Sequence, residues 1–220
     1  AQLITAANVF VHISDVHQVL RGIVDLLDDG GVFVSENHYF LDLVDTLQYD
    51  TIYHEHLRYY SVTALKGLFE AHDMEVFRVS RIPTHGGSIR VYSCRKGERE
   101  VEMSVSEFLK EEEDFGLNDG SALKKFKKDV LQSKLDLMAL LADIKKQGQS
   151  VYGIGAPSRA STLINYVGLD EGVMDCVLEI SSSKKLDKYI PGTRIPVLDE
   201  AKLFSDQPEY ALLLSWHISD

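Results

Sequence analysis

Residues 27–36 read LDDGGVFVSE, and this segment decides the fold of the first half of the chain. Its two glycines end a helix that we expect over residues 15–27, because glycine readily adopts the left-handed backbone found after a helix. The apolar run at residues 32–36 is typical of a buried parallel strand. With a first strand inside residues 1–10, these elements predict one β-α-β unit, which is typical of an α/β fold.

Further elements follow this unit along the chain. A short helix is expected near residues 41–48, and Ser61 is a good N-cap for a helix that reaches about residue 72. Two strands, near residues 74–82 and 88–95, are joined by a turn that contains Gly86 and Gly87. The simplest arrangement for them is an antiparallel pair at a sheet edge.

The second half begins with a charged stretch at residues 96–118, where we place a domain boundary. Its acidic run, residues 111–114, is expected to be a solvated helix face. Apolar residues then recur at three- and four-residue spacing over residues 121–147, the pattern of one long amphipathic helix. A second β-α-β unit follows, with strands expected from residue 150, over residues 173–180 and over residues 210–216.

Composition excludes several classes of function. The chain has 23 basic and 34 acidic residues in 220, a net charge of −11, which argues against nucleic acid and anionic membrane surfaces as partners. It lacks an apolar run long enough to cross a membrane. Cys94 and Cys176 are far apart in the sequence, so neither a disulfide framework nor a cysteine zinc site is supported. We therefore expect a soluble cytoplasmic protein.

One short loop concentrates groups that can transfer protons. Tyr53-His54-Glu55-His56 brings two imidazoles, a carboxylate and a phenol into four residues, and acid/base catalysis uses such groups. Alternation along an extended segment would place Tyr53 and Glu55 opposite His54 and His56, so a single site requires the loop to bend. The spacing is not that of a helical His-Glu-x-x-His metal site, and we expect no metal.

Four blocks of the chain, in order, resemble the sugar C-methyltransferases. They are residues 8–15 (NVFVHISD), 53–61 (YHEHLRYYS), 85–92 (HGGSIRVY) and 153–159 (GIGAPSR). Enzymes of this family use S-adenosylmethionine to methylate a ring carbon of a nucleotide-linked 4-keto-deoxysugar. The resemblance covers nearly the whole chain and implies the C-terminal part of such an enzyme.

The resemblance implies a three-part architecture. Residues 1–97 would be the back half of a class I methyltransferase (Rossmann-like) domain, residues 98–147 a helical linker, and residues 148–220 a second Rossmann-like α/β domain. The family's zinc domain and its Gly-rich cofactor loop have no counterpart before Ala1, so we expect this segment to be inactive alone. The oligomeric state is not predicted.

The resemblance also implies roles for particular residues. His56 would be the base that forms an enolate, Glu55 would fix or tune it, and Tyr53 and His12 would be acid/base partners or donors to the ketone oxygen. Asn8 would lie on the cofactor side. His54 and His85 are weaker candidates for substrate binding, together with Arg159. Each has a structural alternative: His12 could cap or pack beside the next helix, and residues 85–87 could be only a hairpin turn.

The glycine turn near Arg159 supports competing hypotheses. Gly153-x-Gly155 follows a strand and opens a helix, and Glu179 ends the next strand where a ribose-binding acid belongs in a dinucleotide fold. Ser158 replaces the third glycine of that motif. A proline before the helix leaves its first amides free for an anion, and the family more often has lysine where Arg159 stands. A phosphate-bearing substrate, structural packing, an NAD-type oxidoreductase and a non-catalytic nucleotide-sugar-binding module remain open.

Overall fold

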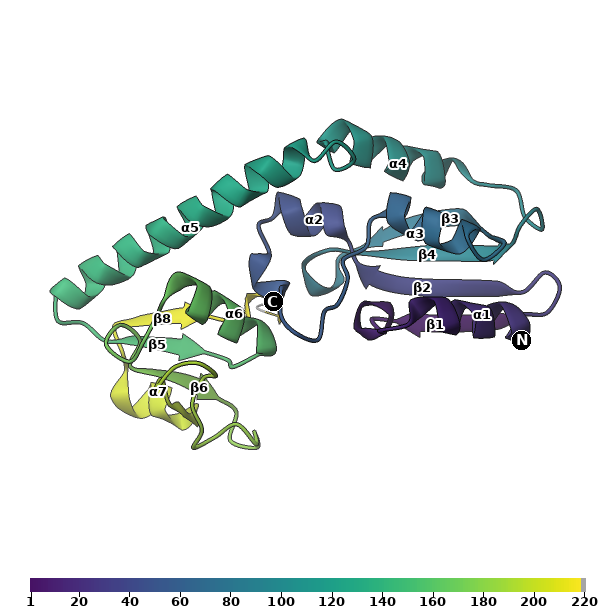
Figure 1. The fold of residues 1–220 in the computed structure, drawn as a ribbon. Helices are drawn as coiled ribbons and strands as arrows, with labels where there is room; N and C mark the ends of the chain where they lie inside the picture. Colours follow the sequence, from purple (N-terminus) through teal and green to yellow (C-terminus); the bar gives the residue numbers. More distant parts are fainter. Residues whose placement is uncertain (219–220) are drawn as a thin grey trace. The chain divides into compact units, whose positions relative to one another are not determined.

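The computed structural model describes residues 1–218, and contacts divide the chain into two units (Figure 1). The first unit contains Ala1–Leu47 and His54–Phe126. The second contains Gln48–Tyr53 and the chain from Lys127 onward. The three-part division at residues 97 and 147 stays a prediction.

The first unit is built on a mixed four-stranded sheet of order β1-β2-β4-β3. Strand β1 (Leu3–Ala7) is parallel to β2 (Val32–His38), as a β-α-β unit requires. Strand β4 (Ser88–Arg95) is antiparallel to β2 and to β3 (Met74–Ile82), which lies at the edge of the sheet. The predicted antiparallel edge pair is confirmed.

Two helices of the first unit begin at residues whose side chains cap them. Helix α1 (Val16–Leu26) has Asp15 as its N-cap, and α3 (Val62–Glu70) has Ser61. Each cap side chain accepts the backbone N–H three residues further on, at 2.9 and 3.0 Å. Helix α2 (Phe40–Asp45) is shorter than predicted and has no side-chain cap.

An aromatic cluster fills the core of the first unit. Phe10, Phe33 and Phe69 are each inaccessible to solvent, and their ring centroids lie 5.5–6.3 Å apart. Burying each side chain stabilises the fold by about 2–3 kcal/mol. Phe10 belongs to the 3₁₀ turn η1 (Phe10–His12), so the segment after β1 is anchored to this core.

The charged segment, residues 96–118, belongs to the first unit. Its helix α4 (Met103–Phe115) packs against the core of that unit. The prediction that the acidic run 111–114 is a solvated helix face is wrong for Glu112, which is fully buried. The Glu112 carboxylate accepts the backbone N–H groups of Val62 and Thr63 at 2.5 and 2.9 Å, and the Thr63 hydroxyl at 2.6 Å. Burial of a charge is compensated by these donors at the N-terminus of α3.

The second unit has a parallel sheet of order β7-β6-β5-β8. Its strands are β5 (Val151–Ile154), β6 (Cys176–Glu179), β7 (Val197–Asp199) and β8 (Tyr210–Leu213). Helix α6 (Ser158–Val167) connects β5 to β6. Strand β7 and helix α7 (Ala201–Asp206) are elements that the sequence did not predict, and β6 is shorter than predicted.

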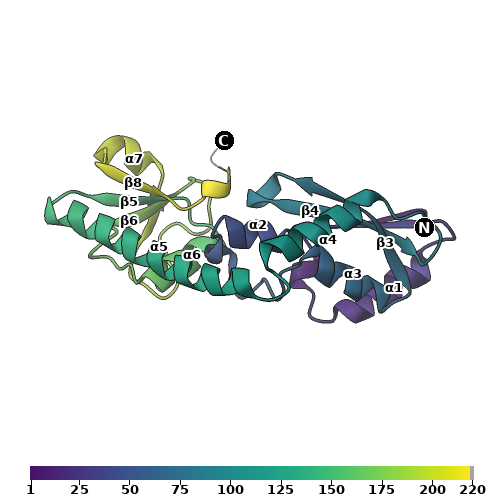
Figure 2. The ribbon, with the colours of Figure 1, turned by 90° about the horizontal axis from the view of Figure 1, so that it is seen from above.

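Helix α5 (Ser121–Lys146) is the predicted long helix, and its C-terminal half lies beside β5 and α6 in both ribbon views (Figures 1 and 2). Its residues Leu141 and Ile144 join the buried core of the second unit with Val151 and Ile164. No helix within residues 1–218 is both long and apolar enough to cross a membrane.

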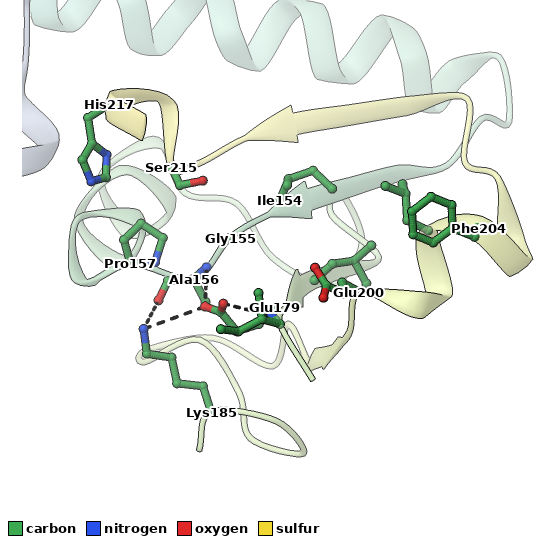
Figure 3. A pocket seen from close by; sticks show the side chains of 13 residues that line it. Ile154, Gly155, Ala156, Pro157, Glu179, Lys185, Glu200, Phe204, Ser215 and His217 are labelled. Carbon is green, nitrogen blue, oxygen red and sulfur yellow. Dashed lines mark hydrogen bonds and ion pairs between the residues drawn. The ribbon is translucent and has the colours of Figure 1, made fainter. Parts of the chain in front are cut away.

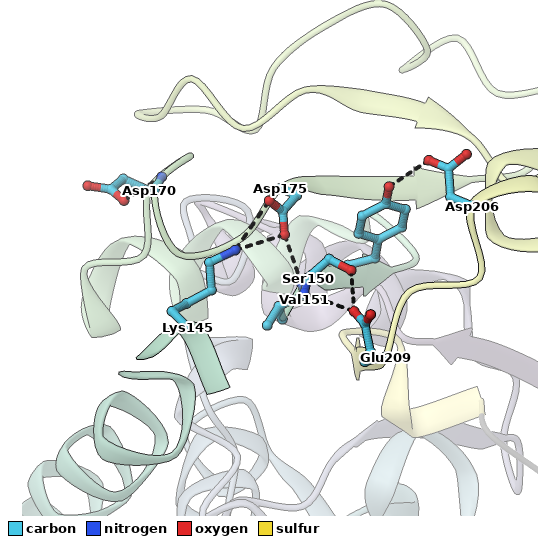
Figure 4. Close-up of polar contacts among 9 residues, drawn as sticks. Lys145, Ser150, Val151, Asp170, Asp175, Asp206 and Glu209 are labelled. Atoms are coloured by element: carbon cyan, nitrogen blue, oxygen red, sulfur yellow. Dashed lines mark hydrogen bonds and ion pairs between the residues drawn. The ribbon is translucent and has the colours of Figure 1, made fainter. Parts of the chain in front are cut away.

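Carboxylates brace the start of β5 (Figure 4). Asp175 accepts the Val151 N–H at 2.8 Å and pairs with Lys145 at 3.1 Å. Glu209 accepts the N–H and the hydroxyl of Ser150 at 3.0 and 2.7 Å. These contacts tie the end of α5 and the segments before β6 and β8 to the amino end of the central strand.

Candidate active site

The ends of β1 and β2 place two polar side chains at one edge of the first sheet. Asn8 follows β1 with a left-handed backbone, φ 54°, and donates its N–H to the Glu36 carbonyl at 2.8 Å. His12 ends η1, beyond the carboxyl end of β1, and His38 is the last residue of β2. Because β1 and β2 are parallel, these residues belong to the same edge of the sheet.

His85 reaches the same edge from the antiparallel hairpin. The pairing of His38 with Ser88 places the start of β4 beside the end of β2. His85 lies just before it, in the 3₁₀ turn η3 (Thr84–Gly86), with a left-handed backbone of φ 57°. The segment is a tight turn, as the structural alternative predicted, and it also brings this imidazole to the candidate site.

The loop that contains His56 bends, as a single site requires. Its backbone bends at residues 53–55 and forms no strand before residue 60. The Arg58 guanidinium donates to the carbonyls of Ile13 and Ser14, and the Leu57 N–H donates to the Val11 carbonyl at 2.9 Å. These bonds hold the loop against the segment that follows β1.

These elements assemble a histidine cluster of His12, His38, His56 and His85. The ring centroids of His56 lie 5.2 Å from His12 and 5.6 Å from His38, and His38 lies 5.4 Å from His85. Tyr59 borders the cluster, 6.3 Å from His56. His56 therefore packs beside two other imidazoles and a phenol, which are groups that acid/base catalysis uses.

A backbone contact determines the tautomer of His12. Its Nδ1 lies 2.8 Å from the carbonyl oxygen of Glu55. A carbonyl can only accept a hydrogen bond, so Nδ1 carries the proton. The Nε2 atom of neutral His12 is then an acceptor, and it becomes a donor when the ring is protonated. This bond links His12 directly to the loop that carries His56.

The other predicted residues of the loop are arranged differently. The His54 side chain is 86% exposed, and its Nε2 lies 4.0 Å from the Glu55 carboxylate, which is also exposed. Tyr53 belongs to the second unit. The structure thus brings together the side chains of His12, His56 and His85. The roles of these histidines, like those of Glu55 and Tyr53, stay predictions.

His38 is a residue of the cluster that the motifs did not predict. The strand there was expected to end at Glu36, two residues too early. Side chains two residues apart share a face of a strand, so continuing that strand by two residues would have identified His38.

Arg159 lies in the second unit and is a buried residue, 5% exposed. Its Nε lies 3.8 Å from the Asp50 carboxylate, and its guanidinium stacks 5.0 Å from the Trp216 ring centre. Trp216 donates from Nε1 to the same carboxylate at 2.9 Å. Burial lowers the pKa of Arg159, while Asp50 and Tyr53 act in the opposite direction.

These contacts favour structural packing for Arg159 over direct substrate binding. Asp50 belongs to the 3₁₀ turn η2 (Tyr49–Thr51), which leads into Tyr53. Thr162 of α6 also donates to the Ile52 carbonyl at 3.0 Å. The second unit therefore holds residues 48–53, directly before the His-Glu-His sequence. Substrate binding by Arg159 stays a prediction.

The described residues contain no group of three His, Cys, Asp or Glu side chains placed to hold a metal ion. The cysteines, Cys94 and Cys176, are free and buried. What the site offers is therefore imidazole, phenol and amide groups at the carboxyl edge of a parallel strand pair.

Comparison with known proteins matches nearly the whole chain to methyltransferases. Residues 83–220 match the family model of the C-methyltransferase C-terminal domain, and residues 1–79 match that of a methyltransferase domain. The chain is 33% identical over 218 residues to the C-methyltransferase NovU of Streptomyces niveus. That alignment covers 99% of the chain and 52% of NovU, so the chain spans about half the length of this curated relative.

Proposed function

Because the chain belongs to the C-methyltransferase family, we propose that it takes part in S-adenosylmethionine-dependent methylation of a carbon beside the ketone of a nucleotide-activated deoxysugar. The observation that carries this proposal is the contact of His56 with His12 and His38. Carbon beside a ketone is unreactive until a base removes its proton. A cluster of imidazoles suits that step, since their ordinary pKa is near neutral.

In the proposed reaction, neutral His56 removes the proton from the carbon beside the ketone. The electron pair of the C–H bond forms the enolate, whose oxygen is stabilised by hydrogen-bond donors. Protonated His12 can donate from Nε2, because its Nδ1 is held by the Glu55 carbonyl. Tyr53 is proposed as a second donor, and Glu55 as the residue that fixes the loop.

The chain offers one residue for the cofactor on the edge that holds the histidine cluster. Asn8 is half-buried and directly follows β1, with its backbone fixed by the Glu36 carbonyl. Its amide can both donate and accept, which fits a polar nucleoside. S-Adenosylmethionine would supply the methyl group for the enolate carbon, with the electron pair of the broken methyl–sulfur bond kept by S-adenosylhomocysteine as the leaving group.

The test is proton exchange at the reacting carbon, measured by NMR in deuterated water with a thymidine-diphosphate 4-keto-6-deoxysugar. We expect His56→Asn to slow exchange by about 100-fold or more, the usual contribution of a general base. His17→Asn is the matched control, because His17 is an exposed residue of α1 that pairs with His72 and does not belong to the cluster, and it should leave exchange unchanged. Equal exchange by both variants would contradict the role of His56.

A further inference from the structure

The second unit has a cavity at the carboxyl edge of its parallel sheet. The cavity measures about 380 Å³, within the range of small-molecule sites. It is lined by the residues that follow three of the strands, among them Ala156 after β5, Glu179 at the end of β6 and Ser215 after β8. None of these residues belongs to the histidine cluster, which lies in the first unit.

The topology places this cavity where α/β sheets bind ligands. The chain runs from β5 outward through β6 to β7, and then β8 pairs on the other side of β5. The direction of the connections thus reverses at β5. Ligands of open parallel sheets bind outside the carboxyl ends of the strands at such a reversal.

Glu179 is the residue best placed to recognise a ligand. One carboxylate oxygen accepts the Ala156 N–H at 3.1 Å, and the other accepts the Ile180 N–H at 3.0 Å. Lys185 donates to the Ala156 carbonyl at 2.6 Å and lies 3.9 Å from the carboxylate (Figure 3). A carboxylate has about four acceptor positions, so Glu179 is held rigidly and can still accept hydroxyl groups.

An apolar wall lies beyond this carboxylate. Phe204 of α7 lines the cavity and is 75% exposed, and Ile180 is also largely exposed. Figure 3 shows Glu179 between Lys185 on one side and Glu200 and Phe204 on the other. An exposed aromatic ring offers a face on which a planar base can stack.

The turn after β5 disfavours a dinucleotide. In a dinucleotide fold, a glycine at the position of Gly155 lets the backbone approach the pyrophosphate of the ligand. Here the close neighbour of Gly155 is Ser215, whose Oγ would lie 2.7 Å from a Cβ added at that position. The Ser215 side chain therefore occupies the space beside Gly155 that a pyrophosphate would need. The remaining part of the cavity suits a smaller ligand.

From this geometry we infer that the second unit binds a single ribonucleoside. The vicinal 2′- and 3′-hydroxyl groups donate to Glu179, and the base stacks on Phe204. The carboxylates of Glu179 and Glu200 outnumber the single Lys185 ammonium among the charged side chains that line the cavity, so the recognised part is the neutral nucleoside and not a phosphate.

The test is calorimetric titration of the whole 220-residue chain with adenosine, uridine, 2′-deoxyadenosine and NAD. We expect saturable binding of adenosine or uridine, and binding of 2′-deoxyadenosine about tenfold weaker than adenosine, the effect of losing a hydrogen bond to a charged group. Phe204→Ala should weaken adenosine binding about tenfold through loss of stacking. Tyr189→Ala is the matched control, because Tyr189 is an exposed aromatic residue of the same unit that does not line the cavity.

Glu179→Gln provides a second variant, and its circular dichroism spectrum checks that the unit is folded. It should lose the preference for the 2′-hydroxyl. The inference is overturned if neither ribonucleoside binds, if the 2′-deoxy compound binds equally well, or if Phe204→Ala binds adenosine like the unchanged chain. Binding of NAD more tightly than adenosine would also overturn it in favour of a dinucleotide site. None of these outcomes depends on methyl transfer.

Discussion

At the scale of single residues, Glu112 shows how a charge can be essential to packing. Its buried carboxylate accepts three hydrogen bonds at the start of α3. In Glu112→Gln, the new amide nitrogen must face at least one of those donors, which leaves a buried N–H without an acceptor. We expect a loss of about 2–3 kcal/mol in the free energy of unfolding, measured by urea denaturation.

Glu113→Gln is the matched control for that variant, because Glu113 is exposed on the same helix. Its effect should lie within about 0.5 kcal/mol of zero. Equal stability of the two variants would show that the Glu112 carboxylate does not cap α3.

Single residues of the histidine cluster differ in whether the sequence could predict them. His12, His56 and His85 could be predicted, because each lies inside a short motif that the sequence shows directly. The motifs did not indicate that His12 contacts the Glu55 carbonyl, since this contact joins positions 43 residues apart. His38 was missed because a strand end is set by its pairing with β4, which the sequence of β2 alone does not show.

At the scale of elements, α7 is held to the second sheet by Asp206. Its carboxylate accepts the Tyr152 hydroxyl of β5 at 2.6 Å and pairs with Lys202 at 2.5 Å. Hydrogen bonds from Lys202, Tyr152 and Ser205 lower the pKa of Asp206 to about 2. The folded pKa lies below the ordinary value of 3.8, so this contribution to stability is present above about pH 4 and is lost as the pH falls towards 2.

A carboxyl carbon NMR titration tests this expectation. The Asp206 resonance should titrate near pH 2, and Tyr152→Phe should raise its pKa towards the ordinary value by removing one donor. Lys202 remains in that variant, so the pKa should stay below 3.8. An unchanged pKa in Tyr152→Phe would contradict a role for the phenol.

The elements themselves were predicted to different extents. The bounds of β3 and β4 were predicted because both have long alternating patterns around a glycine turn. Strand β7 has only three residues and α7 six, too few to show a period of two or 3.6. Such short elements are specified by the neighbours that they pair with, here β6 and β5.

At the scale of the whole molecule, residues far apart in the sequence specify each unit. Asp50 is 109 positions before Arg159 and 166 before Trp216, yet its carboxylate contacts both side chains. No local pattern indicates that residues 48–53 belong with the C-terminal sheet. The segment that the motifs assigned to one site is divided between the two units, with Tyr53 in one and His54 in the other.

The buried ion pair of Asp50 and Arg159 joins residues 48–53 to the rest of the second unit. Asp50→Ala removes the acceptor of Trp216 and leaves the Arg159 charge buried without its partner, so we expect a loss of about 3–5 kcal/mol in stability. Trp216 is the single tryptophan of the chain, and its fluorescence during denaturation reports on this contact. Asp45→Ala, at an exposed position of the first unit, is the control and should leave the transition in place. If Asp50→Ala also leaves it in place, the pair does not stabilise the second unit.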